Sequence, residues 1–237
     1  MINVLTWLWR QSKGRTRYTA EHVNIWAAMV GRNLSLPHRL YCVTNIPDGI
    51  TEEVGIIDLP TVFNGVQSKA WPAQAGKPQC YCRIDMFRPD AAEIYGERIV
   101  SMDLDCVVTG RLDPLFDRGN DFIMLKSESP RRPYNGSMVM MDAGARARVY
   151  KKFRASRMEE VNKVFVGSDQ AWISYALGWC EDVWTEQDGV YQWTHGFMKH
   201  SKNGKKPPDD MRLLFFPVPQ KPWQLMDKYK WIREFYK

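Results

Sequence analysis

Two aspartates one residue apart, Asp103 and Asp105, follow an apolar run in the segment SMDLDCVVTG, Ser101–Gly110. In a strand, residues i and i+2 point to the same side, so both carboxylates are predicted to converge while Met102 and Leu104 face the other way. Converging carboxylates repel unless a cation lies between them, and Mg²⁺ or Mn²⁺ prefers oxygen ligands and leaves positions open for phosphate. The pair predicts a metal-bound diphosphate site; the alternative is a strand-to-loop transition where both carboxylates merely face solvent.

The elements around the aspartates alternate between strands and helices, which predicts an α/β fold with a mainly parallel central sheet flanked by helices. Helical spacing places one apolar face on the first helix, at Val23, Trp26, Ala27, Val30 and Leu34. A loop is expected over 191–208. Strands are expected over 2–9, 38–45, 54–60, 97–105, 121–125 and 137–142, and helices over 19–34, 81–90, 143–153, 168–177 and 223–237.

The chain has 237 residues, of which 44% are hydrophobic, and this is enough for a globular protein with a sizeable core. We expect one domain over 1–237. The formal charge of +6 favours anionic partners. Five cysteines without C-x-x-C spacing favour a reduced, cytoplasmic protein and argue against a structural zinc site. No apolar run approaches the length of a membrane span, and no nucleic-acid reader motif accompanies the lysines.

Further motifs surround the aspartates in a fixed order: YCRIDMFRP, GERIVSMDLDCVVTGRLDPLFD, YNGSMVMMDAG, GSDQAWISYAL and QKPW. This ordered set, which extends over Met1–Trp223, resembles the retaining, glycogenin-like glycosyltransferases. The resemblance implies a single Rossmann-like GT-A domain that binds a nucleotide-diphosphate sugar through Mn²⁺ (or Mg²⁺) held by the D-x-D aspartates. It further implies transfer of a hexose, UDP-linked by resemblance, to an acceptor hydroxyl with retention at the anomeric carbon.

The resemblance also implies roles for single residues. Asp105 would contact the metal most directly, and Asp103 would hold metal or ribose. Arg83 would neutralise phosphate or touch the donor; the alternative is a surface salt bridge. Asn135 would hydrogen-bond sugar hydroxyls while Gly136 lets the backbone approach the donor, unless Asn-Gly forms a hairpin turn.

In GSDQAW, Ser168 is expected to cap a helix whose first turn brings Asp169 and Gln170 near the sugar. By resemblance these two would position the donor and stabilise the transition state without forming a covalent intermediate; alternatively, Asp169 is only a favourable helix charge. Thr6 and Trp7, at the end of the first strand, are candidates for contacting the nucleotide base, although Trp7 equally suits the core.

The C-terminal motif departs from the family pattern, which places a metal-binding His and a Gly before Lys-Pro-Trp. Here Phe215–Pro217 occupy that neighbourhood, and Lys221 remains available to a phosphate. Three explanations are open. Water completes the coordination shell, His195 or His200 reaches in from the predicted loop, or metal-dependent activity is lost.

The last fifteen residues, 223–237, interleave aromatic and basic side chains. Packing on the core is favoured, while peripheral contact with a membrane carrying a lipid-linked acceptor is the alternative. The acceptor class is open among glycans, lipid-linked glycans and proteins. Two rival functions remain. A sugar nucleotidyltransferase normally has a Gly-rich loop that WRQSKGRTR does not supply, and a non-catalytic nucleotide-sugar or glycan binder would explain the missing histidine.

Overall fold

The computed structural model describes residues 1–10, 16–66 and 80–237. Its larger sheet has seven strands in the order β3-β2-β1-β4-β7-β6-β8. Strands β1, β2, β3 and β4 are parallel, β8 is parallel to β6, and β7 runs antiparallel to both β4 and β6. The strands are β1 (Ile2–Leu8), β2 (His38–Thr44), β3 (Val54–Asp58), β4 (Arg98–Met102), β6 (Phe122–Lys126), β7 (Tyr134–Asp142) and β8 (Val183–Trp184). The predicted α/β fold with a mainly parallel sheet is confirmed.

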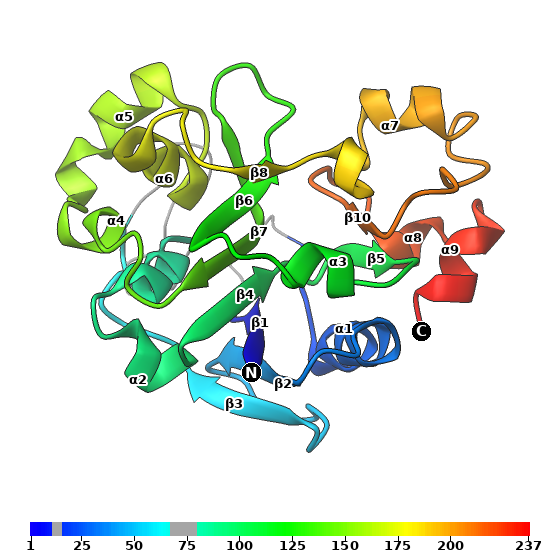
Figure 1. Ribbon diagram of the computed structural model, residues 1–237, viewed down its shortest axis with the longest axis horizontal. Coiled ribbons are helices and arrows are strands. Elements are labelled where there is room, and N and C mark those ends of the chain that lie inside the picture. Colours follow the sequence, from blue (N-terminus) through cyan, green and yellow to red (C-terminus); the bar gives the residue numbers. More distant parts are fainter. Residues whose placement is uncertain (11–15, 67–79) are drawn as a thin grey trace.

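Helices cover both faces of this sheet (Figure 1). One face carries η1 (Cys80–Phe87), α2 (Ala91–Tyr95), α4 (Arg148–Lys151), α5 (Met158–Val164) and α6 (Asp169–Leu177); η2 (Ala155–Arg157) precedes α5. The other face carries α1 (Ala20–Asn33) together with core residues between Val190 and Tyr236. All five residues of the face predicted for the first helix are buried.

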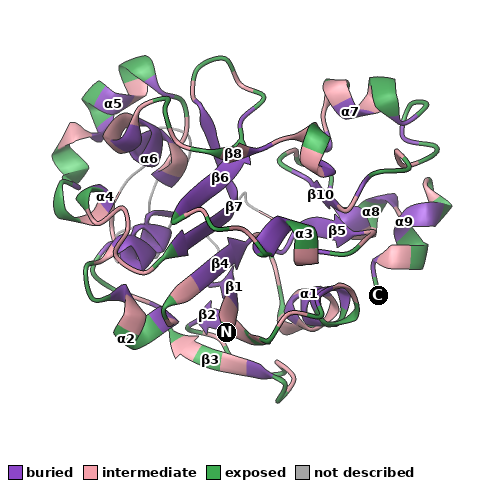
Figure 2. Ribbon diagram, viewed as in Figure 1, coloured by how far each residue is buried: buried purple, intermediate pink, exposed green. Residues whose placement is uncertain are grey.

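Strand β1 supplies both faces of the core because its side chains alternate between them. Val4 and Leu8 pack with α1, whereas Leu5 and Trp7 pack with η1 and α6. Figure 2 shows the central strands as buried and the outward helix surfaces as exposed. A strand buried on both sides reads as a continuous apolar run, which is why β1 was recognisable in the sequence.

A smaller sheet of three strands adjoins the larger one: β5 (Cys106–Val108), β10 (Leu213–Phe215) and β9 (Val190–Gln192). Strand β10 pairs antiparallel with β5 and parallel with β9. The strand predicted over 97–105 is present as β4 but ends earlier than expected. Strand β4 ends at Met102, residues 103–105 form a bend, and β5 then enters the other sheet.

Three further expectations about elements need correction. The helix expected over 81–90 is the 3₁₀ helix η1, and only α4 is α-helical within 143–153. The loop expected over 191–208 contains most of β9 and all of α7 (His195–His200), preceded by η3 (Glu186–Asp188). Its aromatic side chains are buried: Trp193 stacks on Phe216 with ring centroids 5.1 Å apart. Aromatic packing therefore orders a segment whose Lys, Gly and Pro residues suggested a loop.

The C-terminal segment forms two short helices, α8 (Pro222–Leu225) and α9 (Lys230–Phe235), rather than one helix over 223–237. Ile232 is fully buried, and the Trp231 indole donates a hydrogen bond to the Gly204 carbonyl at 2.8 Å. Ile232 and the aromatic residues Trp231 and Tyr236 pack on the core, as the sequence favoured. Among the residues that the structure describes, no helix is both long and apolar enough to cross a membrane.

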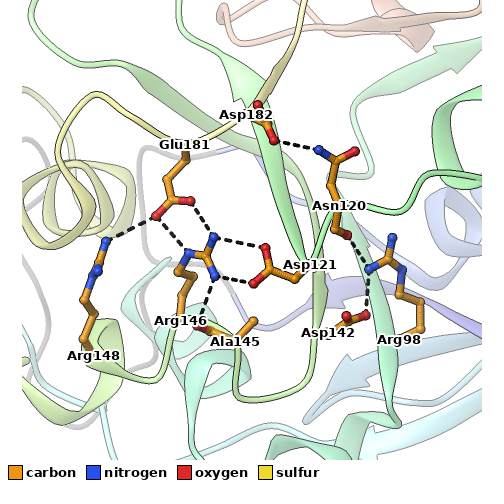
Figure 3. Close-up of polar contacts among 9 residues, drawn as sticks. All are labelled: Arg98, Asn120, Asp121, Asp142, Ala145, Arg146, Arg148, Glu181 and Asp182. Atoms are coloured by element: carbon orange, nitrogen blue, oxygen red, sulfur yellow. Dashed lines mark hydrogen bonds and ion pairs between the residues drawn. The ribbon is translucent and has the colours of Figure 1, made fainter.

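An arginine network ties the edge of the large sheet to the segments around it (Figure 3). The Arg146 guanidinium makes two bonds to Glu181, both 2.8 Å, and two to Asp121, at 2.8 and 3.1 Å. It also lies over the Phe122 ring, 5.2 Å from the centroid. Arg146 thereby joins the end of β7 to the start of β6 and to the segment before β8.

The remaining helix, α3 (Asp113–Phe116), follows β5 and takes no part in this network.

Replacing Arg146 with Ala should lower the free energy of unfolding by about 2 kcal/mol, because bidentate charge-assisted bonds to a largely buried carboxylate are lost. Urea denaturation measures the change. The matched control is Arg233→Ala, which removes an arginine whose pair with Asp227 is exposed, and it should leave stability essentially unchanged. Equal effects of the two substitutions would contradict a structural role for the network.

Candidate active site at the bend between the sheets

The bend that carries the two aspartates is fixed by main-chain bonds to both sheets. The Asp103 amide donates to the Ser137 carbonyl of β7 at 2.9 Å. The Phe216 amide, just after β10, donates to the Asp105 carbonyl at 2.9 Å. The two carboxylates thus lie at the carboxyl end of β4, where ligands bind in open α/β sheets. The bend replaces the last three residues of the predicted strand, and each carboxylate meets a different cation.

Arg83 holds the first aspartate. Its Nη1 lies 2.5 Å from Asp103 Oδ1, its Nε donates to Asp169 Oδ2 at 2.8 Å, and Nη1 also lies 3.3 Å from the Gly136 carbonyl oxygen. Arg83 is 8% exposed, so the alternative of a surface salt bridge does not apply. One guanidinium from η1 therefore connects β7, α6 and the bend.

Lys221 holds the second aspartate. Its ammonium lies 2.5 Å from Asp105 Oδ2 and 2.7 Å from the Phe216 carbonyl oxygen, and both charged side chains are buried. The Tyr18 hydroxyl donates to the same Asp105 oxygen at 3.0 Å. Tyr18 also packs edge-on against Trp223, with centroids 5.8 Å apart. Sequence reasoning missed Tyr18, because nothing in its spacing connects it with the aspartates.

Burial and neighbouring charges shift the pKa values of this cluster in opposing ways. Burial raises the pKa of the Asp103 carboxyl; Arg83 opposes that rise, and repulsion from Asp105 adds to it. Burial also disfavours the charge on Arg83, but Asp169 and Asp103 outweigh it and raise the Arg83 pKa. The Asp103 side chain keeps 28% of its surface exposed, so it remains reachable from solvent.

The Asn-Gly pair lies inside β7, so it does not form a hairpin turn. The β6–β7 ladder shifts register here: Met124 pairs with Val139, but Leu125 pairs with Asn135. This β-bulge frees the Gly136 backbone, whose amide donates to Gln170 Oε1 at 3.1 Å while its carbonyl accepts from Arg83. The bulge thus brings the main chain into the cluster, as glycine permits.

Asn135 is already engaged with protein partners. Its Nδ2 donates to Gln192 Oε1 at 2.5 Å, and its Oδ1 accepts from the Ser137 amide at 3.0 Å. The residue is 4% exposed. Gln192, which belongs to β9 and was not singled out in the sequence, therefore lies between the two sheets beside the cluster.

Asp169 begins α6 and is 1% exposed. Its Oδ2 accepts from Arg83, and its Oδ1 accepts from the Ser168 hydroxyl at 2.9 Å. Ser168 occupies the N-cap position but makes no capping hydrogen bond, so the expected cap is wrong: its hydroxyl serves Asp169 instead. Gln170, half-buried, stands beside the Gly136 amide.

The residues proposed for the nucleotide base lie in the core at the end of β1. Trp7 is 5% exposed, and its indole donates to the Ser101 hydroxyl at 2.9 Å. Thr6 is fully buried, and its hydroxyl has no hydrogen-bond partner in the described part of the chain. Packing accounts for Trp7, whereas base contact by either residue stays a prediction.

A metal at this site would have two protein carboxylates as ligands. Within residues 1–10, 16–66 and 80–237 no group of three or more His, Cys, Asp or Glu side chains could hold an ion. His200 instead lies 3.7 Å from Glu186, His195 is exposed on α7, and Phe215 and Phe216 are fully buried. Two carboxylates fit an ion that completes its shell with water and phosphate oxygens, as Mg²⁺ commonly does.

No protein-family model matches the chain, and a comparison with curated proteins finds no relative. Solved structures, however, match over nearly its whole length. The galactosyltransferase LgtC, in complex with donor and acceptor sugar analogues, has a TM-score of 0.65 at 13% identity over 99% of this chain and 95% of that one. Mouse xyloside xylosyltransferase 1 has a TM-score of 0.57 at 12% identity, covering 90% and 96%.

The glycosyltransferase GlyE from Streptococcus pneumoniae TIGR4 gives a TM-score of 0.60 at 14% identity, and the match covers 94% of this chain but 57% of that one. At these identities the likeness concerns the fold. The chain has the GT-A fold of glycosyltransferases, with the Asp103–Asp105 bend at the carboxyl end of its sheet.

Replacing Asp169 with Asn should lower the free energy of unfolding by about 3 kcal/mol, because the buried Arg83 guanidinium loses an ionic partner. Urea denaturation monitored by tryptophan fluorescence measures the loss. Asp227→Asn is the matched control, since that carboxylate is exposed and its arginine partner is exposed too. An unchanged stability in Asp169→Asn would contradict the role of Arg83 as a buried, doubly paired cation.

Proposed function

We propose that the protein is a metal-dependent, retaining glycosyltransferase that moves a hexose from a nucleotide-diphosphate sugar, UDP-linked, to an acceptor hydroxyl. One observation carries the proposal. At the carboxyl end of β4, in a GT-A fold, Asp103 and Asp105 lie beside two buried cations, Arg83 and Lys221. Such a constellation suits a diphosphate and the ion that accompanies it.

The charge balance supports a divalent cation. Three carboxylates, those of Asp103, Asp105 and Asp169, face the two cations Arg83 and Lys221, which leaves the cluster net negative. A diphosphate would meet repulsion there. A divalent ion held by Asp103 and Asp105 would reverse the sign and, when bound, would offset the charge that builds on the leaving diphosphate.

The side chains of the cluster have distinct roles in this proposal. Lys221 and Arg83 provide positive charge next to the phosphates. Asp169 fixes the Arg83 guanidinium, and a direct contact of Asp169 with the sugar remains part of the prediction. Gln170, held by the Gly136 amide through its oxygen, retains an amide NH₂ that can donate to a sugar hydroxyl.

The state of Asp169 argues against a covalent intermediate on this residue, which is compatible with the proposed retaining transfer. Both of its oxygens are engaged, by Arg83 and Ser168, and the side chain is closed to solvent. A carboxylate so held is a poor nucleophile toward an anomeric carbon. Transfer on one face of the donor, assisted by the leaving phosphate, requires no such nucleophile.

A thermal-shift panel of UDP, GDP, ADP and CMP, with and without Mn²⁺, tests the donor site. A ligand at about 100-fold its Kd stabilises the folded state by about 2.7 kcal/mol, which raises Tm by roughly 5–10 °C at this chain length. We expect UDP with Mn²⁺ to give such a rise. Asp103→Asn/Asp105→Asn should abolish it, whereas Asp48→Asn/Asp117→Asn, which alters two exposed aspartates, should not.

The variants need a control for folding, because Asp105→Asn leaves the Lys221 ammonium buried without its partner. Asp105→Asn/Lys221→Met removes both charges and should still lose the Mn²⁺ dependence. An undiminished Mn²⁺-dependent rise in these variants would show that the metal assignment is wrong. Mn²⁺-dependent hydrolysis of the UDP-sugar separates enzyme from binder: binding without hydrolysis of any donor would favour a non-catalytic binding protein.

A further inference from the structure

A second feature of the molecule, outside the aspartate cluster, is a cavity of about 610 Å³ between β6, β8 and β9. Its size lies within the range of small-molecule sites. The residues that line it include Lys126, Glu128, Trp184, Glu186 and Gln192. Trp184 is fully buried, and its indole Nε1 has no hydrogen-bond partner among residues 1–10, 16–66 and 80–237. Because Trp184 belongs to the cavity wall, its indole N–H can report on a molecule that binds there.

The cavity is next to the cluster that carries the aspartates. Gln192 lies in its wall and accepts a hydrogen bond from Asn135. The next residue, Gly136, contacts Arg83 and Gln170, and Ser137 holds the Asp103 amide. The Gln192 and Asn135 side chains therefore link the cavity wall to the proposed donor site. Because the acceptor hydroxyl attacks the donor directly, the reacting end of an acceptor in this cavity would have to extend past Gln192.

The charge of the cavity wall restricts what can bind. Among the described lining residues Glu128 and Glu186 are acidic, and Lys126 is the one cation. Glu128 is exposed as a residue, yet partial desolvation of its carboxyl raises its pKa. Repulsion from Glu186 adds to this rise, whereas a hydrogen bond from Thr194 opposes it. Outside the wall, His200 approaches Glu186 to 3.7 Å. Carboxylates accept hydrogen bonds from sugar hydroxyls and ammonium groups but repel an anionic sugar.

We propose that this cavity is the acceptor site, and that Glu128 and Glu186 restrict it to glycans whose reacting end is neutral or amine-bearing. The proposal rests on the glycosyltransferase function proposed above. Uronic acids and phosphorylated sugars are disfavoured as acceptors. Gln192 is a positioning residue that joins the acceptor cavity to the donor site through Asn135.

Binding of small glycosides tests the cavity directly. The probes are the methyl glycosides of a hexose, of the corresponding 2-amino-2-deoxyhexose and of the corresponding uronic acid, titrated to about 100 mM because single sugars bind weakly. The readout is the indole N–H signal of Trp184 in a two-dimensional ¹H–¹⁵N NMR spectrum, assigned by its absence in Trp184→Phe. We expect the first two glycosides to shift this signal and the uronic acid to bind at least tenfold more weakly.

The preference against the uronic acid should disappear when the charges of Glu128 and Glu186 are removed. In Glu128→Gln/Glu186→Gln the three glycosides should bind within a few-fold of one another, whereas Glu93→Gln/Glu97→Gln, which alters exposed carboxylates on and next to α2, should keep the preference. Equal binding of the uronic acid to the unmodified protein would overturn the proposal. So would the absence of any shift of the Trp184 signal with all three probes. The Mn²⁺-dependent nucleotide shift does not involve this cavity, so its persistence would show that the donor site stands while the acceptor assignment fails.

Discussion

The position of one guanidinium determines the geometry of the candidate site. Arg83 joins the bend at Asp103, the start of α6 at Asp169 and the Gly136 carbonyl of β7, three segments far apart in the sequence. A buried arginine is tolerated only when its donors are matched with acceptors. The two carboxylates and the bulged strand are thus held in one arrangement before any ligand arrives, which is what a preorganised electrostatic site requires.

Backbone irregularities make this arrangement possible. The bend at 103–105 ends β4 and sends the chain into the smaller sheet, so Asp105 meets Lys221 from the C-terminal segment. The bulge in β7 frees the Gly136 amide and carbonyl from the ladder. In a regular strand, these backbone amide and carbonyl groups would be hydrogen-bonded to the neighbouring strands. The site is formed where regular pairing stops, and regular pairing elsewhere supports it.

The sequence predicted those parts of the structure that periodicity and composition determine. The apolar run of β1, the buried face of α1 and the helix after Gly167 follow from local pattern, and the fold class follows from their alternation. Local pattern does not predict the bend, the 3₁₀ form of η1 or the ordered structure of residues 191–208. These features depend on partners that are distant in the sequence. Trp193 is buried by aromatic partners such as Phe216, which is 23 positions away in the sequence. Tyr18 joins the site through its hydrogen bond to Asp105 and its packing on Trp223.

A metal site with Asp103 and Asp105 as its two protein ligands would have a consequence for the order in which ion and nucleotide bind. Because Lys221 already pairs with Asp105, a divalent ion held by the two carboxylates would gain less when it binds alone than when it binds together with a diphosphate. A diphosphate supplies further oxygen ligands and also offers Lys221 a second anionic partner. Ion and nucleotide should then each raise the affinity for the other by the same factor, as linkage requires. Lys221 would thereby favour joint binding of ion and nucleotide over binding of either one alone. The apolar neighbours of Asp105 would strengthen this coupling, because they keep water from screening it.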